Sequence, residues 1–272
     1  EGLKRTVHTA VIICLAGGIL ITVFGILFSH NILALMNTKD ELIDGAVLYL
    51  RIYLLGMPAL GLYNFGNAVL SAAGDTKRPL YYLAFAGVVN VILNLFFVIV
   101  CHLGVAGVAL ASMISQFISA FLILRALLTG KEKYCLRLSE IRFDKRKAVG
   151  ILQIGIPSAF QYSLFAFANL FVQSSVNSFD HVLVEGNSAA ANADPLVYDM
   201  MAAFYTACSS FIAQNFGARK KKRILQTYLI CLFYSFITSL VLGVGIYLAR
   251  YPFLYLFTSD KAVVEAVSYT HL

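Results

Sequence analysis

The chain contains 272 residues, of which 60% are hydrophobic and only 13% are charged. Soluble domains contain about half apolar and about a quarter charged residues, so this composition excludes an ordinary water-soluble globule. Binding of nucleic acid would need a basic face on a soluble fold, and the net charge of +7 therefore needs another explanation. The five cysteines are scattered without a C-x-x-C pair, which indicates neither a disulfide framework nor a zinc site.

Seven apolar stretches are long enough to cross a bilayer, because about 20 helical residues span a hydrocarbon core of about 30 Å. Short polar turns separate them. The sequence therefore predicts an all-α fold, a polytopic membrane helical bundle. The predicted spans run approximately over 9–29, 47–73, 79–101, 103–128, 148–178, 188–215 and 224–249.

The basic residues are distributed unevenly between the two ends of these spans. With seven crossings, 17 of the 21 Lys and Arg fall on one side, which is the asymmetry expected if that side is cytoplasmic. The loops at 77–78, 125–147 and 219–223 are then cytoplasmic. This distribution supports the seven-span count, explains the net charge without nucleic acid, and predicts a multi-pass protein of the cytoplasmic membrane.

An internal repeat relates residues 40–49 to residues 260–269, at an offset of 220 residues. Six predicted helices separate the copies, and an even number gives both copies the same orientation in the membrane. Chance similarity between two amphipathic helix starts is the alternative. A true repeat predicts two six-helix halves, with this chain forming part of a longer protein.

Six short motifs occur along the chain in one order. They are MP at 57–58, SAAGDTKRP at 71–79, NVILN at 90–94, GVAGVALAS at 104–112, GIP at 155–157 and QNFGAR at 214–219. Each motif is weak, but their order and spacing are specific, and together they resemble the multidrug and toxic compound extrusion (MATE) family. The resemblance covers essentially all 272 residues and corresponds to the third through ninth helices, and the start of the tenth, of a twelve-helix fold.

The resemblance implies two lobes and a secondary active transporter, not an enzyme. Residues 1–130 would form part of the first six-helix lobe, 131–147 a cytoplasmic linker, and 148–272 part of the second lobe. Organic compounds, often cationic and amphipathic, would be exported by antiport with Na⁺ or H⁺. We expect no cofactor beyond that coupling ion, a monomer in the lipid bilayer, and no nucleic-acid partner.

A lipid-linked oligosaccharide flippase of the same superfamily is the alternative function. Such a protein would be expected to have a charged, especially Arg-rich, central cavity. The predicted spans are nearly free of Lys and Arg, which favours the exporter.

In the family, a cation site in the first lobe combines an acid on the first helix with an Asn and, four residues later, an Asp on the fifth. Here Asn90 matches that Asn, and Asn94 stands where the Asp is expected. Ser112 occupies the position of a Thr ligand, and Asn67 matches a neighbouring Asn. Asn90 and Asn94 share one helical face by spacing alone. Asn94 cannot carry a proton, and hydrogen bonding between helices is an alternative role for both amides.

Polar residues on the predicted seventh helix fall within one half of its circumference. Such a face suits the lining of a cavity, although packing between helices would also explain it. One branch of the family has a Glu on this helix where this chain has Phe165, so a second-lobe carboxylate site is not expected. The polar residues are Gln161, Asn169, Gln173 and Asn177.

Asp199 lies near the middle of the predicted span 188–215, roughly 18 Å deep at 1.5 Å per residue. An acid at that depth is a functional candidate, and a protonated Asp199 bonded to a neighbouring helix is the alternative. Aromatic and polar side chains could also line a pocket for aromatic cations, or face lipid and core instead. These are Arg51, Tyr63, Asn64, Tyr162 and Tyr205.

Overall fold

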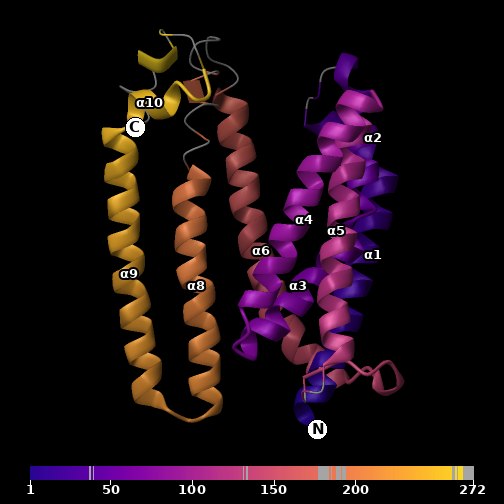
Figure 1. Ribbon diagram of the computed structural model, residues 1–272, viewed down its shortest axis with the longest axis vertical. Coiled ribbons are helices and arrows are strands. Elements are labelled where there is room, and N and C mark those ends of the chain that lie inside the picture. Colours follow the sequence, from indigo (N-terminus) through magenta and orange to yellow (C-terminus); the bar gives the residue numbers. More distant parts are fainter. Residues whose placement is uncertain are drawn as a thin grey trace. The chain divides into compact units, whose positions relative to one another are not determined.

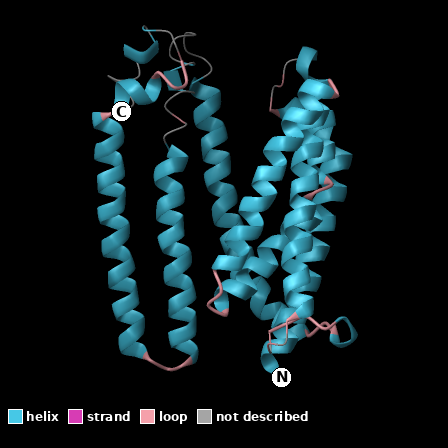
Figure 2. Cartoon of the chain, viewed as in Figure 1, coloured by secondary structure: helices cyan, strands magenta, loops and turns pink. Residues whose placement is uncertain are grey.

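In the computed structural model of the chain, the described residues form helices joined by short loops, as the sequence predicts (Figure 2). The description covers residues 1–36, 38, 40–130, 132, 134–176, 184, 186–187, 191, 194–258, 261 and 263–265. The α-helices are α1 (Gly2–Leu35), α2 (Asp40–Leu54), α3 (Met57–Ala72), α4 (Lys77–Leu95), α5 (Gly104–Thr129), α6 (Lys145–Val176), α8 (Asp194–Gly217), α9 (Lys221–Leu248) and α10 (Arg250–Leu254). A π-helix, η1 (Phe96–Val100), extends α4, and a 3-10 helix, η2 (Leu138–Glu140), lies between α5 and α6.

The chain divides into two compact units, Glu1–Gly155 and Ile156–Leu272, with the boundary inside α6. In the first unit α1 packs against α2 and α3, and α5 packs against α2, α3 and α4. In the second unit α8 and α9 pack side by side and are joined by a short turn (Figure 1). The predicted division into lobes at 1–130 and 148–272 stays a prediction, and most of the second copy of the repeat lies outside the described residues.

Six described helices are long and apolar enough to cross a membrane, namely α1, α4 with η1, α5, α6, α8 and α9. The helices α2 and α3 meet at a bend of 43° and together qualify as a seventh span. Lys4 at the start of α1 forms an ion pair of 3.1 Å with Glu140, which follows α5. Both residues therefore lie at the same membrane face, which requires an even number of crossings between them. Counting α2 and α3 as one span gives that even number and agrees with the predicted seven.

The bend between α2 and α3 follows from Pro58, which has no N–H to donate to the carbonyl of Leu54, four residues earlier. The hydroxyl of Thr22 on α1 donates a hydrogen bond of 2.7 Å to that carbonyl instead. Close approach of the helices makes this contact possible, because a Cβ on Gly18 would lie 2.6 Å from the Cα of Pro58. Because Gly18 has no side chain, α1 can pack closely against the bend between α2 and α3.

The core of the first unit is apolar and lies between α1, α3 and α5. Phe65 and Leu70 on α3 pack there with Ile123 and Leu127 on α5. By contrast, no described residue of α9 is buried, although the helix is apolar over most of its length. A helix that is apolar on all faces suits a bilayer or the interior of a larger bundle.

Candidate functional site

A chain of hydrogen bonds joins the polar residues of α4 and α5. The amide nitrogen of Asn94 donates to both the backbone carbonyl and the Oδ1 of Asn90, each at 3.0 Å. The amide nitrogen of Asn90 lies 3.4 Å from the Oγ of Ser115 on α5. The hydroxyl of Ser115 donates a 2.9 Å bond to the carbonyl of Ser112. The shared face predicted for Asn90 and Asn94 is therefore present, and it is directed toward α5.

Two side-chain oxygens in this region are buried without a described hydrogen-bond partner. One is the Oδ1 of Asn94 and the other is the Oε1 of Gln116, one residue after Ser115. Gln116 reaches the bend between α2 and α3, because its Oε1 contacts the position that a Cβ on Gly56 would take. A buried amide oxygen without a donor costs about 1–3 kcal/mol, so these atoms are suited to accept a donor or coordinate a cation.

The α5 side of this cluster was missed by the sequence prediction, apart from Ser112. Ser115 and Gln116 lie three and four residues after Ser112, which places all three on one face of α5. That spacing is the signal that could have identified them. We call Asn90, Asn94, Ser112, Ser115 and Gln116 the amide cluster. All five side chains are half-buried.

The amide cluster contains no ionisable side chain, and this determines its chemistry. It offers neutral oxygen atoms, which are the ligands that alkali and alkaline-earth cations take in proteins. It offers no group that could hold a transferable proton at neutral pH. A coordinated cation would therefore keep its full charge unless an acid from elsewhere compensates it.

Four other predicted residues of the first unit lie outside the amide cluster, and three of them are on α3. Asn67 is half-buried, and its Oδ1 accepts a bond of 3.2 Å from Ser71 on the same helix. Tyr63 is only 5% exposed and donates to the carbonyl of Pro79 at 3.0 Å, so it lies in the core instead of on a cavity wall. Asn64 is exposed.

Arg51 also has a structural partner. Its Nε donates a 2.9 Å bond to the hydroxyl of Ser29, which links α2 to α1. The predicted role of Arg51 in a pocket for aromatic cations is not supported by this contact.

In the second unit, Gln161 and Asn169 on α6 are exposed, as are Tyr162 on α6 and Tyr205 on α8. The side chain of Gln173 and the whole of Asn177 lie outside the described residues. The predicted polar face of α6 is therefore described only in its first half.

Asp199 lies nearer to the start of its helix than the predicted span 188–215 implies. The helix α8 begins at Asp194, and Pro195 follows in its first turn, where a proline is well tolerated. Asp199 is thus five residues from the helix start and not near the middle of the span. Its side chain is exposed in the described structure.

Comparison with known proteins identifies the family. The family model described as MatE matches residues 1–96 and 157–271. The probable multidrug resistance protein YpnP of Bacillus subtilis (strain 168) is 33% identical over 201 residues, which cover 74% of this chain and 44% of that protein. For the probable multidrug resistance protein YoeA of the same organism the identity is 28% over 270 residues, covering 96% of this chain and 58% of that protein.

The fold is also that of a solved relative. A MOP superfamily transporter from Pyrococcus furiosus superposes with a TM-score of 0.89 at 22% identity, over 97% of this chain and 60% of that chain. The chain spans about half the length of the curated relatives it matches. The family model matches most of the chain, as the order of the motifs implies, and the chain belongs to the MatE family.

Proposed function

We propose that the full-length protein is a secondary active transporter that exports organic, often cationic and amphipathic compounds in exchange for Na⁺ or H⁺. Membership of the MatE family supports this proposal. So does the similarity to YpnP and YoeA, which are named as probable multidrug resistance proteins. In this proposal the residues of the first lobe bind the coupling ion and carry out no covalent chemistry.

The amide cluster supports coupling of transport to a cation. A cation that leaves water inside a membrane must be coordinated again by oxygen atoms. Asn94, which is bonded to Asn90, has a buried oxygen that lacks a described donor, and Asn90 on α4 bonds to Ser115 on α5. Gln116 offers a second such oxygen where α5 meets the bend between α2 and α3. Because Asn94 replaces the acid expected from the family pattern, a compensating carboxylate must come from outside the cluster. Na⁺ fits this neutral oxygen set, whereas H⁺ would have to bind elsewhere.

The flippase alternative is less well supported. In the six candidate spans every Lys and Arg lies within the first four residues of the helix, except Arg125, which lies within the last five residues of α5. A cavity for a lipid-linked, phosphate-bearing saccharide would need several cations within those spans.

The proposal is tested by ethidium efflux from cells that express the full-length protein. Na⁺ and pH gradients are varied separately, and Asn94→Ala and Asp199→Asn are measured beside the wild type. Efflux that depends on a gradient identifies both the antiporter and its ion, and loss in Asn94→Ala assigns coupling to the amide cluster. Failure to export ethidium under either gradient would contradict a broad specificity for organic cations.

A further inference from the structure

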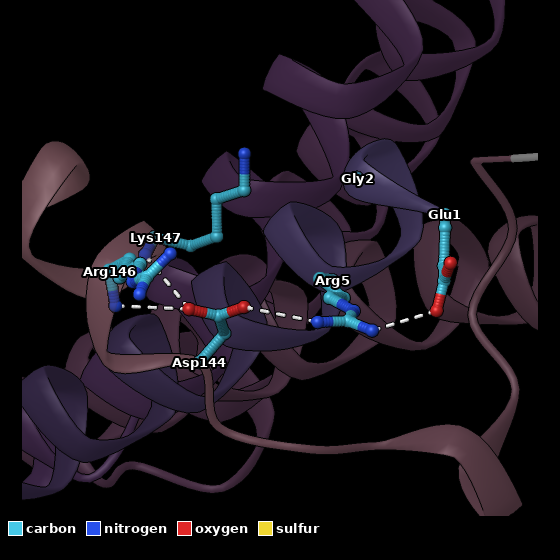
Figure 3. A pocket seen from close by; sticks show the side chains of 6 residues that line it. All are labelled: Glu1, Gly2, Arg5, Asp144, Arg146 and Lys147. Carbon is cyan, nitrogen blue, oxygen red and sulfur yellow. Dashed lines mark hydrogen bonds and ion pairs between the residues drawn. The ribbon is translucent and has the colours of Figure 1, made fainter.

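A basic pocket lies where the start of α1 meets the segment before α6. It has a volume of about 690 Å³ and is lined by residues 1, 4–5, 8, 139–140 and 142–146. A neighbouring hollow of about 470 Å³ shares Arg5, Asp144 and Arg146 with it and adds Lys147 (Figure 3). All these residues belong to the first unit. The basic pocket is separate from the amide cluster, and the proposed transport function does not use it.

Two cations of the basic pocket are already paired with acids. Lys4 contacts Glu140 at 3.1 Å, and Arg5 contacts Glu1 at 2.7 Å and Asp144 at 3.9 Å. These pairs fix the wall of the pocket by tying α1 to the segment between α5 and α6. Figure 3 shows Arg5 extended between the carboxylates of Glu1 and Asp144.

Three other cations of the pocket have no described acidic partner. They are Arg142, Lys145 and Arg146, and all three side chains are exposed. The Oδ1 of Asp144 does not pair with these side chains, because it accepts hydrogen bonds from the backbone N–H of Arg146 at 3.0 Å and of Lys147 at 3.2 Å. The pocket thus has fixed walls and unpaired guanidinium and ammonium groups, an arrangement suited to a phosphate group.

The position of the pocket identifies the source of that phosphate. It lies at the ends of two candidate membrane spans, α1 and α6, and therefore at the level of lipid headgroups. Its side of the membrane is the one that collects most Lys and Arg, the side that faces anionic cytoplasmic lipids. Phe143, which lines the pocket, is 59% exposed, and the neighbours in sequence of other lining residues include Leu3 at 55% and Leu138 at 71%. A soluble phosphate compound would gain nothing from these side chains, whereas acyl chains would pack on them.

We infer that the basic pocket binds the phosphate headgroup of an anionic phospholipid from the cytoplasmic leaflet. Arg142, Lys145 and Arg146 contact the phosphate, and the apolar side chains beside the pocket contact the start of the acyl chains. Phosphatidylglycerol is a suitable probe, because its headgroup carries one net negative charge and no cation.

The test measures how strongly spin-labelled phosphatidylglycerol associates with the full-length protein in phosphatidylcholine membranes, by electron paramagnetic resonance. In the wild type, phosphatidylglycerol is expected to associate more strongly than spin-labelled phosphatidylcholine. The double variant Lys145→Ala with Arg146→Ala should reduce this preference about fivefold for each cation removed, the factor that corresponds to about 1 kcal/mol per basic residue. Both residues are exposed, so the variant is expected to fold.

The matched control is Lys222→Ala with Arg223→Ala, which removes the same two residue types from the first turn of α9. This variant should reduce the preference clearly less than the pocket variant does, because Lys222 and Arg223 line neither of the two hollows. Any loss that it shows measures the general effect of surface charge, which the loss in the pocket variant must exceed. Equal loss in both double variants would overturn the pocket assignment. Equal association of the two lipids with the wild type would overturn it too. Displacement of the lipid by millimolar glycerol 3-phosphate would instead assign the pocket to a soluble phosphate compound.

Discussion

At the scale of single residues, the amide cluster is a neutral site in a position where the family pattern places a carboxylate. Asn94 is bonded to Asn90, which reaches Ser115 on the next helix. The same bonds would hold α4 against α5 if no cation bound there. Stability and ion dependence must therefore be measured together to separate the two roles.

Replacement of Asn90 by Ala should affect both properties. It removes the bond to Ser115 and the acceptor for Asn94, so the free energy of unfolding in SDS titration should fall by about 0.6–1.7 kcal/mol, the range for such bonds between membrane helices. If the cluster coordinates Na⁺, stabilisation by added Na⁺ should also disappear. The control is Asn64→Ala on α3, an exposed amide, which should change neither value. Unchanged Na⁺ stabilisation in Asn90→Ala would leave the cluster with a packing role only.

Glu140 provides a pH-dependent contact at the membrane surface. The hydrogen bond from Lys4 holds the pKa of Glu140 below its ordinary value of 4.5, with Arg137 as a further cation nearby. The ion pair therefore stabilises the folded state fully above pH 4.5, and this contribution is lost as the pH falls through the lower folded pKa.

Spin labels at the exposed positions Leu3 and Leu138 can follow this contact. The distance distribution between the labels should stay narrow at pH 7 and broaden only below about pH 4.5, when Glu140 becomes protonated. Glu140→Gln should give the broad distribution already at pH 7, with no further change on acidification. A narrow distribution in Glu140→Gln would show that the Lys4–Glu140 ion pair does not hold the segment between α5 and α6 against α1.

The sequence could predict residues whose role depends on local spacing, but not those whose role depends on a distant partner. The common face of Asn90 and Asn94 follows from helical periodicity alone. Tyr63 was assigned to a cavity because its partner, the carbonyl of Pro79, is identified only by the packing of the two helices. For Asp199, the apolar stretch in the sequence predicts a span from residue 188, whereas α8 begins at Asp194, so the depth of this residue in the membrane stays a prediction.

At the scale of elements, the broken helix α2–α3 is held by α1. The apolar run over 47–73 predicts one continuous span, and the bend at Gly56 was not predicted from it. The bend depends on a proline and on a replacement donor, Thr22, whose position is known only after α1 has packed. Composition therefore determines that this segment crosses the membrane, whereas tertiary contacts determine its shape.

Adjacent glycines on α1 give a matched test of this packing. Gly18→Ala places a methyl group 2.6 Å from the Cα of Pro58, so the helices must separate. We expect a loss of about 1–3 kcal/mol in SDS titration, as for other overpacked sites. Gly17→Ala meets no atom within 4 Å in the described structure and should leave stability the same or slightly higher. Equal effects of the two substitutions would contradict the close approach of α1 to Pro58.

At the scale of the whole molecule, the alternation of spans assigns each loop to a side of the membrane. Cys101, which is exposed between η1 and α5, should lie outside the cell, whereas Cys135, between α5 and α6, should lie inside. A single-cysteine variant with Cys101 should react with a membrane-impermeant maleimide in intact cells. The variant with only Cys135 should not react until the cells are permeabilised and the protein is unfolded, because this thiol is buried. Reaction of Cys101 only after permeabilisation would contradict this topology and place Cys101 inside the cell.

Transport by purified full-length protein in proteoliposomes tests the central claim most directly. Ethidium movement is followed with an imposed Na⁺ gradient at equal pH, and with an imposed pH gradient without Na⁺, for the wild type and Asn90→Ala. We predict that the Na⁺ gradient drives ethidium against its own gradient in the wild type and drives it much less in Asn90→Ala. Uptake that neither gradient affects, or that Asn90→Ala leaves unchanged, would contradict an antiporter coupled through the amide cluster.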